Sequence, residues 1–535
     1  MNPPVNSANN VRVFAWVIFL TVLAGAVLAR IHLLGLPLER DEGEYAYTGQ
    51  LLLQGIPPYQ SAYSMKFPGT AVAYALLMSI FGETGRGIHL GLITVNLGTT
   101  IFILLIGRRL FGEIAGISAA AAFSALTLMP YVLGQAAHAT HFVLLPAAAG
   151  CFALLSTVER SSKIRLFVSG TLFGVAVLMK QPGLFFALFG AAYLFGRDLA
   201  ERARLRSALL RNLLFLSGVA TPLLVTGLIL WQAGVFEKFW FWTITYTQHY
   251  AREVPIRVGL RILKNHFPSV IAAAWPIWVI AIIGLIRELF YDFRWTRGFL
   301  VELTFFGIMA VCAGLYFRPH YFILLLLPVS LLAGNAVTTA LTAVGNRRAY
   351  TSFAVILLFA LALVWPIWKE RDFLFERSIT EANRMVNGTN PFPESIKIAE
   401  FIREQSTPSD TIAVLGSEPQ IYFYAKRHSA TGYIYTYGLM EPQPFANQMQ
   451  QEMIREIESA RPKFLVLVVM NRSWLVWPDS DLSIFKWATK YCDENYDEVG
   501  LINISDTGTN YYFPRPPDTT PTEDHILMYQ RKSAL

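Results

Sequence analysis

The sequence contains few charged residues and few cysteines, and both shortages restrict the class of protein. Only 15% of its 535 residues are charged, against about 25% in a typical soluble domain, while 54% are hydrophobic. We therefore expect lipid to surround most of the chain. Its three cysteines, Cys151, Cys312 and Cys492, lie far apart, so neither a disulfide framework nor a cysteine metal site is expected. The net charge is +7, but the basic residues do not form a basic face on a soluble domain. This argues against a nucleic-acid partner.

The chain is instead rich in long apolar runs, about eleven of which we interpret as membrane spans. Most approach the ~20 residues needed to cross a bilayer. They cover residues 11–29, 88–106, 114–133, 142–158, 166–179, 183–195, 213–232, 268–286, 299–317, 321–341 and 351–368. The first run is longer than a signal-peptide core, so we interpret it as a retained helix. The apolar stretch 68–81 is short for a span, and we expect a re-entrant or interfacial segment there.

Basic residues gather in alternate connections between these runs, which predicts the orientation of the chain. The clusters are Arg108/Arg109, Arg160/Lys163/Arg165, Arg197/Arg202/Arg204/Arg206/Arg211, Arg287/Arg294/Arg297 and Arg347/Arg348. By the positive-inside rule they mark cytoplasmic loops, so the N-terminus is expected inside and the C-terminus outside.

The connection 233–267 does not fit this pattern. It is expected outside, yet it contains five basic residues: Lys238, Arg252, Arg257, Arg261 and Lys264. Either the rule is locally violated, or these charges bind something anionic.

After Trp368 the composition changes to that of a small soluble domain. Periodicity predicts helices at 394–405, 419–426 and 448–460 and buried strands at 411–415, 464–469 and 525–529. We therefore divide the chain into a membrane domain, 1–368, and an extracytoplasmic α/β domain, 369–535. The smaller domain has no phosphate-binding glycine loop and no metal-ligand cluster, so it is expected to serve as a cap or an acceptor-docking domain.

The first external loop, 34–69, concentrates charge beside the membrane. It contains Arg40, Asp41, Glu42, Glu44 and Lys66. On a helix, Asp41 and Glu42 diverge by about 100°, whereas Glu44 shares the face of Asp41. One interpretation is a solvated loop with an Arg40–Glu44 pair. The other makes Asp41 a general base at the membrane surface.

Further polar groups fall at the same predicted level of the membrane. They are Lys66, His138, His141, Lys180, Gln181, Arg318 and His320. The two cations Lys180 and Arg318 could snorkel to the interface, and His138 and His141 could bind a metal or, as is more common, hydrogen-bond a neighbouring helix. Cations facing carboxylates are also what a reaction of a lipid phosphate requires, because the cations stabilise the phosphate and a carboxylate accepts a proton.

Several motifs resemble those of the GT-C membrane glycosyltransferases, in particular the protein O-mannosyltransferase and aminoarabinose transferase group. The stretch Arg40-Asp41-Glu42-Gly43-Glu44-Tyr45 is similar to that group's acidic first-loop motif, and Lys66-Phe67-Pro68-Gly69 to its Lys-Pro-Pro motif. Further similarities lie at Gly107-Arg108-Arg109-Leu110-Phe111-Gly112, Lys180-Gln181-Pro182, Arg318-Pro319-His320-Tyr321-Phe322 and Ser417-Glu418-Pro419. These motifs occur in the same order as in the family, and most are predicted on the outer side of the membrane. Together they make the resemblance more specific than any one motif would.

The resemblance implies a fold, a donor and a set of site residues. The fold would be an all-α polytopic membrane protein of GT-C type, with about 11–12 transmembrane helices and a small C-terminal α/β domain. The donor would be a polyprenyl-phosphate-linked sugar, transferred with inversion. Asp41 matches the catalytic position and Glu42 its acidic companion. Lys66, Lys180 and Arg318 match positions near the donor phosphate, and Glu44, His320 and Tyr321 are expected to bind substrate.

Two departures from the family pattern bear on the mechanism. Phe67 stands where many relatives have proline, and Ala139-Thr140-His141 occupies a place where many carry a carboxylate. The second departure argues against a two-acid or metal-bridged reaction, so we expect no metal and no cofactor.

We therefore predict a glycosyltransferase in the plasma (inner) membrane. The acceptor would be a hydroxyl of a glycolipid such as a lipopolysaccharide, of a cell-wall polymer or of a protein. The main alternative is a transporter or flippase for polyprenyl-linked lipids. Transporters usually show paired halves with broken helices near the midplane. The sequence shows no such repeat.

Overall fold

The computed structural model describes residues 5–159, 162–290, 295–344, 349–505 and 508–532. The chain forms two compact units, each assembled from segments that are distant in sequence. The first unit comprises Met1–Leu34, His89–Leu228 and Val254–Arg377, and the second comprises Gly35–Ile88, Ile229–Glu253 and Ser378–Leu535. A single division of the chain at one residue does not describe this arrangement. The predicted cytoplasmic residues Arg160, Arg294, Arg347 and Arg348 lie outside the described residues.

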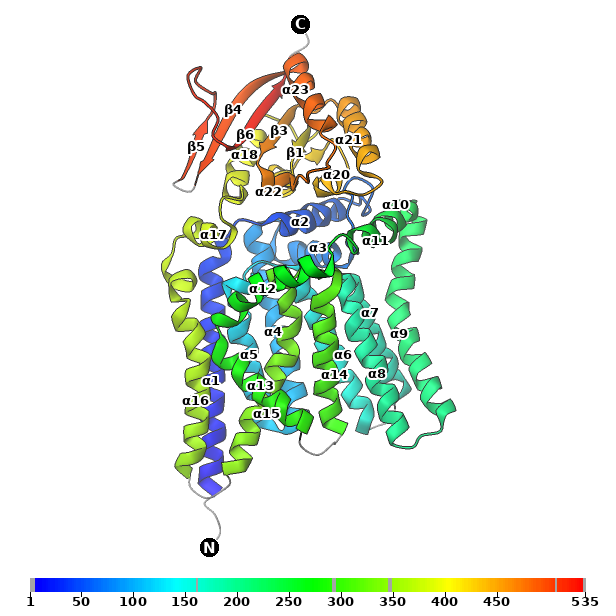
Figure 1. Cartoon of the computed structure of the whole chain (residues 1–535), viewed down its shortest axis with the longest axis vertical. Helices are drawn as coiled ribbons and strands as arrows, with labels where there is room; N and C mark the ends of the chain where they lie inside the picture. The colour runs from blue at the N-terminus through cyan, green and yellow to red at the C-terminus, as the bar shows by residue number, and fades with distance from the viewer. Residues whose placement is uncertain (1–4, 160–161, 291–294, 345–348, 506–507, 533–535) are drawn as a thin grey trace. The chain divides into compact units, whose positions relative to one another are not determined.

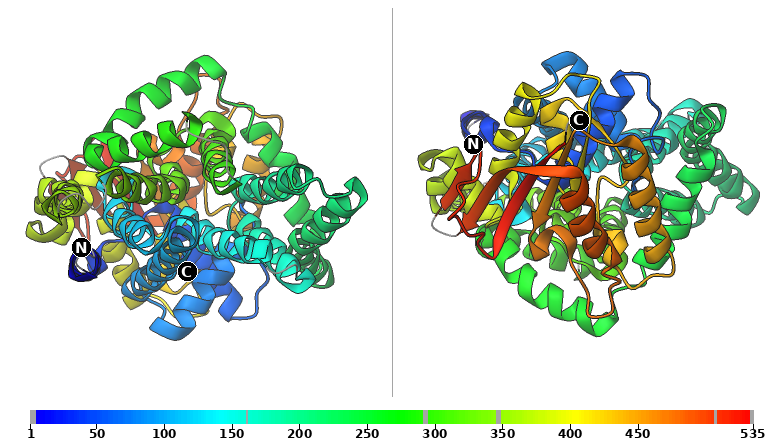
Figure 2. Two further views of the ribbon diagram at one scale, coloured as in Figure 1. Left: turned by 90° about the horizontal axis from the view of Figure 1, so that it is seen from below. Right: turned by 90° about the horizontal axis from the view of Figure 1, so that it is seen from above.

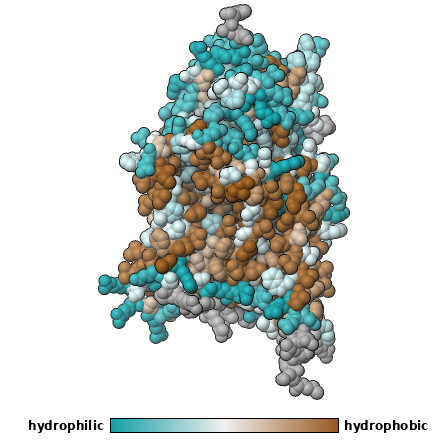
Figure 3. All heavy atoms as spheres, turned by 180° about the vertical axis from the view of Figure 1, so that it is seen from behind, coloured by the Kyte–Doolittle hydropathy of each residue, from teal (hydrophilic) through white to brown (hydrophobic). Residues whose placement is uncertain are grey.

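The first unit is a bundle of long helices, seen end-on at the left of Figure 2. Its members are α1 (Val5–His32), α4 (Gly85–Phe111), α5 (Glu113–Leu126), α6 (Ala139–Glu159), α7 (Lys163–Met179), α8 (Leu184–Ala200), α9 (Leu205–Gln232), α12 (Ile256–Ala272), α13 (Trp275–Phe290), α14 (Trp295–Cys312), α15 (Ile323–Val344) and α16 (Ala349–Lys369). Many large apolar side chains on these helices are exposed, among them Leu224 and Leu358. Figure 3 shows a broad brown, hydrophobic surface on this part of the molecule. Such faces are stable in lipid rather than in water.

Most of every predicted apolar run is helical, which confirms a polytopic helical protein. Among the described residues, eight helices are long and apolar enough to cross a membrane, or nine if α12 and α13 form one span. This is fewer than the 11–12 expected. The difference lies mainly in α5 and α7, whose 14 and 17 residues correspond to about 21 and 26 Å of helix, short of a ~30 Å hydrocarbon layer.

The run predicted as one span at 268–286 is divided between two helices. α12 and α13 are bent by 103° at a short break. The amphipathic pattern of residues 256–267 continues through Pro268 to Ala272, so the start of the run belongs to a different helix from its end.

The second unit contains the first external loop, the segment around residue 240 and the C-terminal part of the chain (Figure 1). Its helices are α2 (Arg40–Leu53), α3 (Gly69–Phe81), α10 (Phe236–Trp240), α11 (Thr247–Tyr250), α17 (Ile379–Asn387), α18 (Phe392–Glu404), α19 (Gln420–Ala425), α20 (Tyr437–Met440), α21 (Ala446–Ala460), α22 (Asn471–Trp474) and α23 (Ser483–Asn495). The 13-residue α3 coincides with the predicted short apolar segment and packs against α2. Its interpretation as re-entrant or interfacial stays a prediction.

The strands of this unit form one mixed sheet with the order β2-β1-β3-β6-β4-β5. They are β1 (Thr411–Leu415), β2 (His428–Ser429), β3 (Phe464–Val469), β4 (Tyr496–Ser505), β5 (Gly508–Tyr512) and β6 (Asp524–Arg531). β1 runs parallel to β2 and β3, and β6 pairs antiparallel with β3 and β4 (Figure 2, right). The predicted α/β fold is confirmed. β4 was not predicted because a bulge between Glu498 and Gly500 interrupts its alternation.

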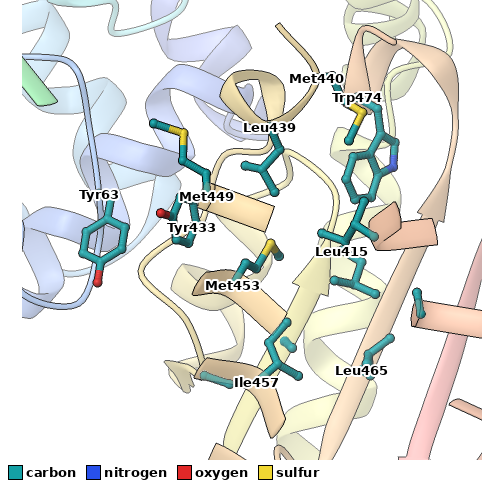
Figure 4. Packing of buried hydrophobic residues seen from close by; sticks show 14 of the residues in the cluster. Tyr63, Leu415, Tyr433, Leu439, Met440, Met449, Met453, Ile457, Leu465 and Trp474 are labelled. Atoms are coloured by element: carbon teal, nitrogen blue, oxygen red, sulfur yellow. The ribbon is translucent and has the colours of Figure 1, made fainter. Parts of the chain in front are cut away.

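A hydrophobic core joins the sheet to the first external loop. β1, β3, α21 and α23 supply half of its buried side chains, including Leu415, Leu465 and Ile457. Tyr63 from the loop packs into the same cluster, near Tyr433 and Met453 in Figure 4. The loop is therefore an integral part of the α/β unit, although more than 300 residues separate the two in sequence.

Candidate active site

The first turn of α2 carries the acidic motif, and a capping box fixes where the helix begins. The side chain of Glu39 accepts a hydrogen bond from the Glu42 amide at 2.9 Å, and that of Glu42 accepts one from the Glu39 amide at 3.1 Å. This reciprocal pairing satisfies two amides that a helix start otherwise leaves unbonded. Burial and the nearby charges of Asp41 and Glu42 raise the pKa of Glu39 to about 8. Glu42, predicted as the acidic companion of Asp41, thus has a capping role.

Arg40 fastens this turn to the C-terminal part of the unit. Its Nε donates to the carbonyl of Ser417 at 2.6 Å, and an Nη donates to Glu418 at 2.8 Å. Glu418 is fully buried and also accepts a bond from Ser473. Burial of Arg40 by itself would lower its pKa, but the surrounding Tyr437 and Glu418 outweigh burial and raise the pKa. The acidic motif and the Ser417-Glu418-Pro419 motif therefore form one buried structure.

Gly43 allows α2 to approach this same segment closely. A Cβ atom at residue 43 would lie 2.6 Å from the backbone nitrogen of Gln420, closer than such atoms pack in proteins. A glycine in the middle of a helix costs about 1 kcal/mol relative to alanine, so close packing is the physical reason for one here.

Asp41 and Glu44 lie on one face of α2 and share a single cation. Lys66 Nζ is 2.8 Å from Asp41 Oδ1 and 2.6 Å from Glu44 Oε2. Ser64 also donates to Glu44, and the Tyr435 hydroxyl lies 3.5 Å from Asp41 Oδ1. The prediction that Asp41 and Glu44 share a helix face is confirmed. The alternative Arg40–Glu44 pair is not formed; Arg40 bonds Glu418 and Glu44 bonds Lys66 instead.

The three groups differ in exposure, and the two acidic side chains control the pKa of Lys66. The Asp41 side chain is 17% exposed, whereas that of Glu44 is 5% exposed. Burial acts to lower the pKa of Lys66, but Asp41 and Glu44 outweigh it and hold the pKa well above its ordinary value. Lys66 therefore stays protonated. Lys66 is therefore held between two acidic side chains, one partly exposed and one almost fully buried.

The loop that carries Lys66 is held by two tyrosines whose partners the sequence did not indicate. The Tyr59 hydroxyl donates to the Lys66 carbonyl at 2.8 Å. The Tyr63 hydroxyl donates to Glu456 at 2.8 Å and accepts from Lys238 at 2.9 Å. The only sign of these contacts in the sequence is that several tyrosines cluster in the loop. Hydrogen bonds between segments that are distant in sequence cannot be predicted from the local pattern of either segment.

The first unit contains a second cluster, which is cationic and aromatic. Lys180, the C-cap of α7, lies 3.4 Å from His320 Nε2 and 4.3 Å from the centre of the Tyr321 ring. The rings of His138 and His320 stack with centroids 4.0 Å apart. Lys180, His320 and Tyr321 were all predicted site residues, and the structure brings these three together.

The remaining predicted residues of this unit lie near the cluster in sequence or in space. Arg318 is the N-cap residue of the short helix Pro319–Phe322, and its guanidinium lies 5.6 Å from the centre of the Tyr316 ring. His141 is buried, and neither of its ring nitrogens has a hydrogen-bond partner. The interpretation that His141 hydrogen-bonds a neighbouring helix is therefore wrong. A lysine side chain beside imidazole rings is suited to bind an anionic ligand.

Comparison with known proteins supports the resemblance drawn from the motifs. Residues 66–231 match the family model described as dolichyl-phosphate-mannose-protein mannosyltransferase. A search of curated proteins returned no significant match.

Solved structures share the fold over nearly the whole chain. ArnT from Cupriavidus metallidurans, solved bound to undecaprenyl phosphate, aligns with a TM-score of 0.60 at 15% identity, covering 96% of this chain and 97% of that one. The Archaeoglobus fulgidus oligosaccharyltransferase, tethered to an acceptor peptide containing the NVT sequon, aligns with a TM-score of 0.56 at 13% identity, covering 94% and 75%. The archaeal oligosaccharyltransferase AglB from the same organism, in complex with an inhibitory peptide and a dolichol-phosphate, gives 0.52 at 14% identity, also covering 94% and 75%.

These comparisons agree with the geometry. The chain is similar to GT-C membrane glycosyltransferases in sequence over residues 66–231 and in fold over nearly its whole length. This similarity confirms the resemblance predicted from the motifs and the predicted class of enzyme, a glycosyltransferase.

Proposed function

We propose that this protein transfers a sugar from a polyprenyl-phosphate donor to an acceptor hydroxyl, with inversion and with Asp41 as general base. The acceptor oxygen attacks the anomeric carbon as the bond from that carbon to the phosphate oxygen breaks. The hydroxyl proton passes to Asp41, and polyprenyl phosphate leaves with the bonding electrons. No protein nucleophile is needed for a single displacement, since the phosphate is already a good leaving group.

The observation that best supports this proposal is that the acidic side chains of α2 have different contacts and exposures. Glu42 caps the helix, and Glu44 is almost fully buried against Lys66 and Ser64. Asp41 keeps a partly exposed carboxylate, oriented by Lys66 and close to Tyr435. A base must be fixed in direction yet reachable by its substrate, and Asp41 meets both conditions.

We assign Lys66 and the Lys180 cluster different tasks. Lys66 is engaged by two carboxylates, so we propose that it positions Asp41 rather than holding the donor phosphate alone. Lys180 and Arg318, with His320 and Tyr321, are the groups we propose for the phosphate. A preorganised cation stabilises the negative charge that develops on the leaving phosphate.

The natural partners follow from the class of reaction. ArnT was solved with undecaprenyl phosphate and the archaeal AglB with dolichol-phosphate, which supports a polyprenyl-phosphate carrier. We propose a glycolipid acceptor of the lipopolysaccharide kind, with a cell-wall polymer or a protein hydroxyl as the other candidates. The protein would lie in the plasma membrane with its N-terminus in the cytoplasm and its α/β unit outside.

The test is transfer by the full chain in lipid nanodiscs. Wild type, Asp41→Asn and the control Asp479→Asn receive a panel of radiolabelled polyprenyl-phosphate sugars and a host glycolipid extract. Asn keeps the shape of the side chain and an oxygen for Lys66 but cannot accept the proton. Asp479 is exposed on the α/β unit, so its replacement controls for loss of one carboxylate. We expect Asp41→Asn to lose about 10²–10⁴-fold in transfer while it still binds donor.

Other outcomes separate the competing interpretations. Equal transfer by wild type and Asp41→Asn would refute the base assignment. If the wild type binds donor but transfers it to no acceptor, while moving it between leaflets, the flippase interpretation gains and the transferase proposal fails.

A further inference from the structure

Helix α12 carries three basic residues that the proposed reaction does not use. Arg257, Arg261 and Lys264 are all exposed. They are spaced at i, i+4 and i+7, so steps of about 100° place them within roughly 60° of one another on the helix. This stripe accounts for most of the basic charge that does not fit the positive-inside pattern in the 233–267 connection.

The opposite side of α12 packs on the rest of the first unit. Gly259 approaches Leu315 so closely that an added Cβ atom would lie 2.8 Å from the Leu315 Cβ. His266 Nδ1 is 3.0 Å from the Phe317 carbonyl, and Val270 is buried. The helix is thus held against the segment that leads into Arg318 and His320.

Between the packed side and the basic stripe, α12 exposes an apolar flank. Ile256 is 69% exposed and Leu260 is 58% exposed, although both side chains are large and aliphatic. The helical positions of these two residues place them some 40° apart, between the buried Gly259 and the basic residues. An apolar flank beside a lysine- and arginine-rich face is the pattern of a helix that lies in a membrane interface.

The direction of α12 agrees with this pattern. α13 packs along α14, α15 and α16 within the bundle, and α12 is bent away from it by 103°. A helix nearly perpendicular to the spans runs along the bilayer surface. Trp275, half exposed, stands at the junction, and tryptophan is enriched at the level of the headgroups.

We propose that α12 is an interfacial docking helix whose Arg257–Arg261–Lys264 stripe binds the headgroup phosphates of anionic phospholipids. The apolar flank enters the acyl boundary, and the three cations stay at the level of the phosphates. Bound lipid fixes α12, and through Gly259 and His266 it also fixes the segment before Arg318.

The experiment measures which lipids the full chain retains. Wild type is placed in nanodiscs of equal phosphatidylglycerol and phosphatidylcholine, extracted in mild detergent, washed at low salt and analysed by mass spectrometry. We expect excess phosphatidylglycerol on the wild type. In Arg257→Gln/Arg261→Gln/Lys264→Gln the ratio of the two retained lipids should fall at least fivefold, since each surface cation is worth about that factor.

Two control variants show whether a change in the lipid ratio comes from misfolding or from the loss of total charge. Arg403→Gln/Lys486→Gln/Lys490→Gln removes three exposed cations from α18 and α23 and should retain the wild-type ratio. Arg257→Lys/Arg261→Lys keeps the charge and should retain it as well. An unchanged ratio in the triple α12 variant, or an equal fall in the control, would overturn the proposal.

Two further measurements test whether the stripe binds a membrane lipid. Washing with water-soluble glycerol phosphate should leave the lipid in place; if it displaces the lipid, the stripe is a free-phosphate site and the proposal is wrong. Spin labels at Leu260→Cys and Arg261→Cys, with Cys151, Cys312 and Cys492 replaced by serine, report depth. We expect oxygen to relax the first label more strongly and a polar nickel reagent the second. Equal nickel access for both labels would place α12 in water and refute docking.

Discussion

Arg40 offers the sharpest test of how the acidic helix is held, because its partners are buried and lie far away in sequence. Its guanidinium bonds the Ser417 carbonyl and the Glu418 carboxylate, and the Glu418 side chain is fully buried. Arg40→Met removes these bonds and leaves Glu418 as a buried charge without its counterion. Breaking one partner of a buried pair typically costs about 3–5 kcal/mol, more than the loss of an exposed pair, because the remaining charge has no water.

That cost converts into a measurable shift in thermal stability. For a cooperative unit of about 150–250 residues, 1 kcal/mol corresponds to about 2–4 °C, so we expect the midpoint to fall by about 6–20 °C. Tryptophan fluorescence in nanodiscs follows unfolding. Arg40→Lys should give an intermediate loss, since an ammonium lacks the fork that reaches both Ser417 and Glu418.

A double-mutant cycle separates the pair from other effects of the substitution. Glu418→Gln relieves the unpaired charge, so Arg40→Met/Glu418→Gln should be more stable than the sum of the two single losses by at least about 1 kcal/mol. A midpoint within about 2 °C of wild type for Arg40→Met, or strictly additive losses, would refute the argument.

Three other perturbations probe the same region and the cationic cluster. Gly43→Ala should destabilise by about 1–3 kcal/mol in thermal melts because its Cβ would lie 2.6 Å from the Gln420 nitrogen, whereas Gly25→Ala, with nothing within 4 Å, should not destabilise; equal effects would contradict close packing at residue 43. Glu39 has a folded pKa of about 8, so the native state keeps a proton that the unfolded chain has lost, and wild-type stability should fall as pH rises from about 5 to 8. Glu39→Gln keeps the capping oxygen but does not titrate, so its melting midpoint should change less over this range; parallel curves for the two proteins would count against the raised pKa. Lys180→Met should weaken donor binding about tenfold or more in a filter assay, with the conservative Lys180→Arg less affected; unchanged binding would remove Lys180 from the phosphate site.

Much of the fold could be predicted because apolar runs and local periodicity are properties of short segments. β1 and β3 have the predicted bounds, Thr411–Leu415 and Phe464–Val469, since each is a buried strand with a clear end signal. Edge strands and bulged strands lack that signal, and β4 and β5 were not predicted for this reason. The bend between α12 and α13 was not predicted either, because hydropathy averages over a break.

Local sequence patterns were enough to predict a polytopic helical membrane protein with an α/β part, and to place Asp41 and Glu44 on one helix face. They also indicated Lys66, Lys180, His320 and Tyr321 as chemically important. The partners of these groups became known from the folded structure. Residues 35–88 and the C-terminal sheet form one unit, Arg40 bonds Glu418, and Lys66 bonds both Asp41 and Glu44. Helix periodicity can be predicted because it depends on neighbours along the chain. Pairing of buried charges instead depends on which segments exclude water together, and no local pattern encodes that.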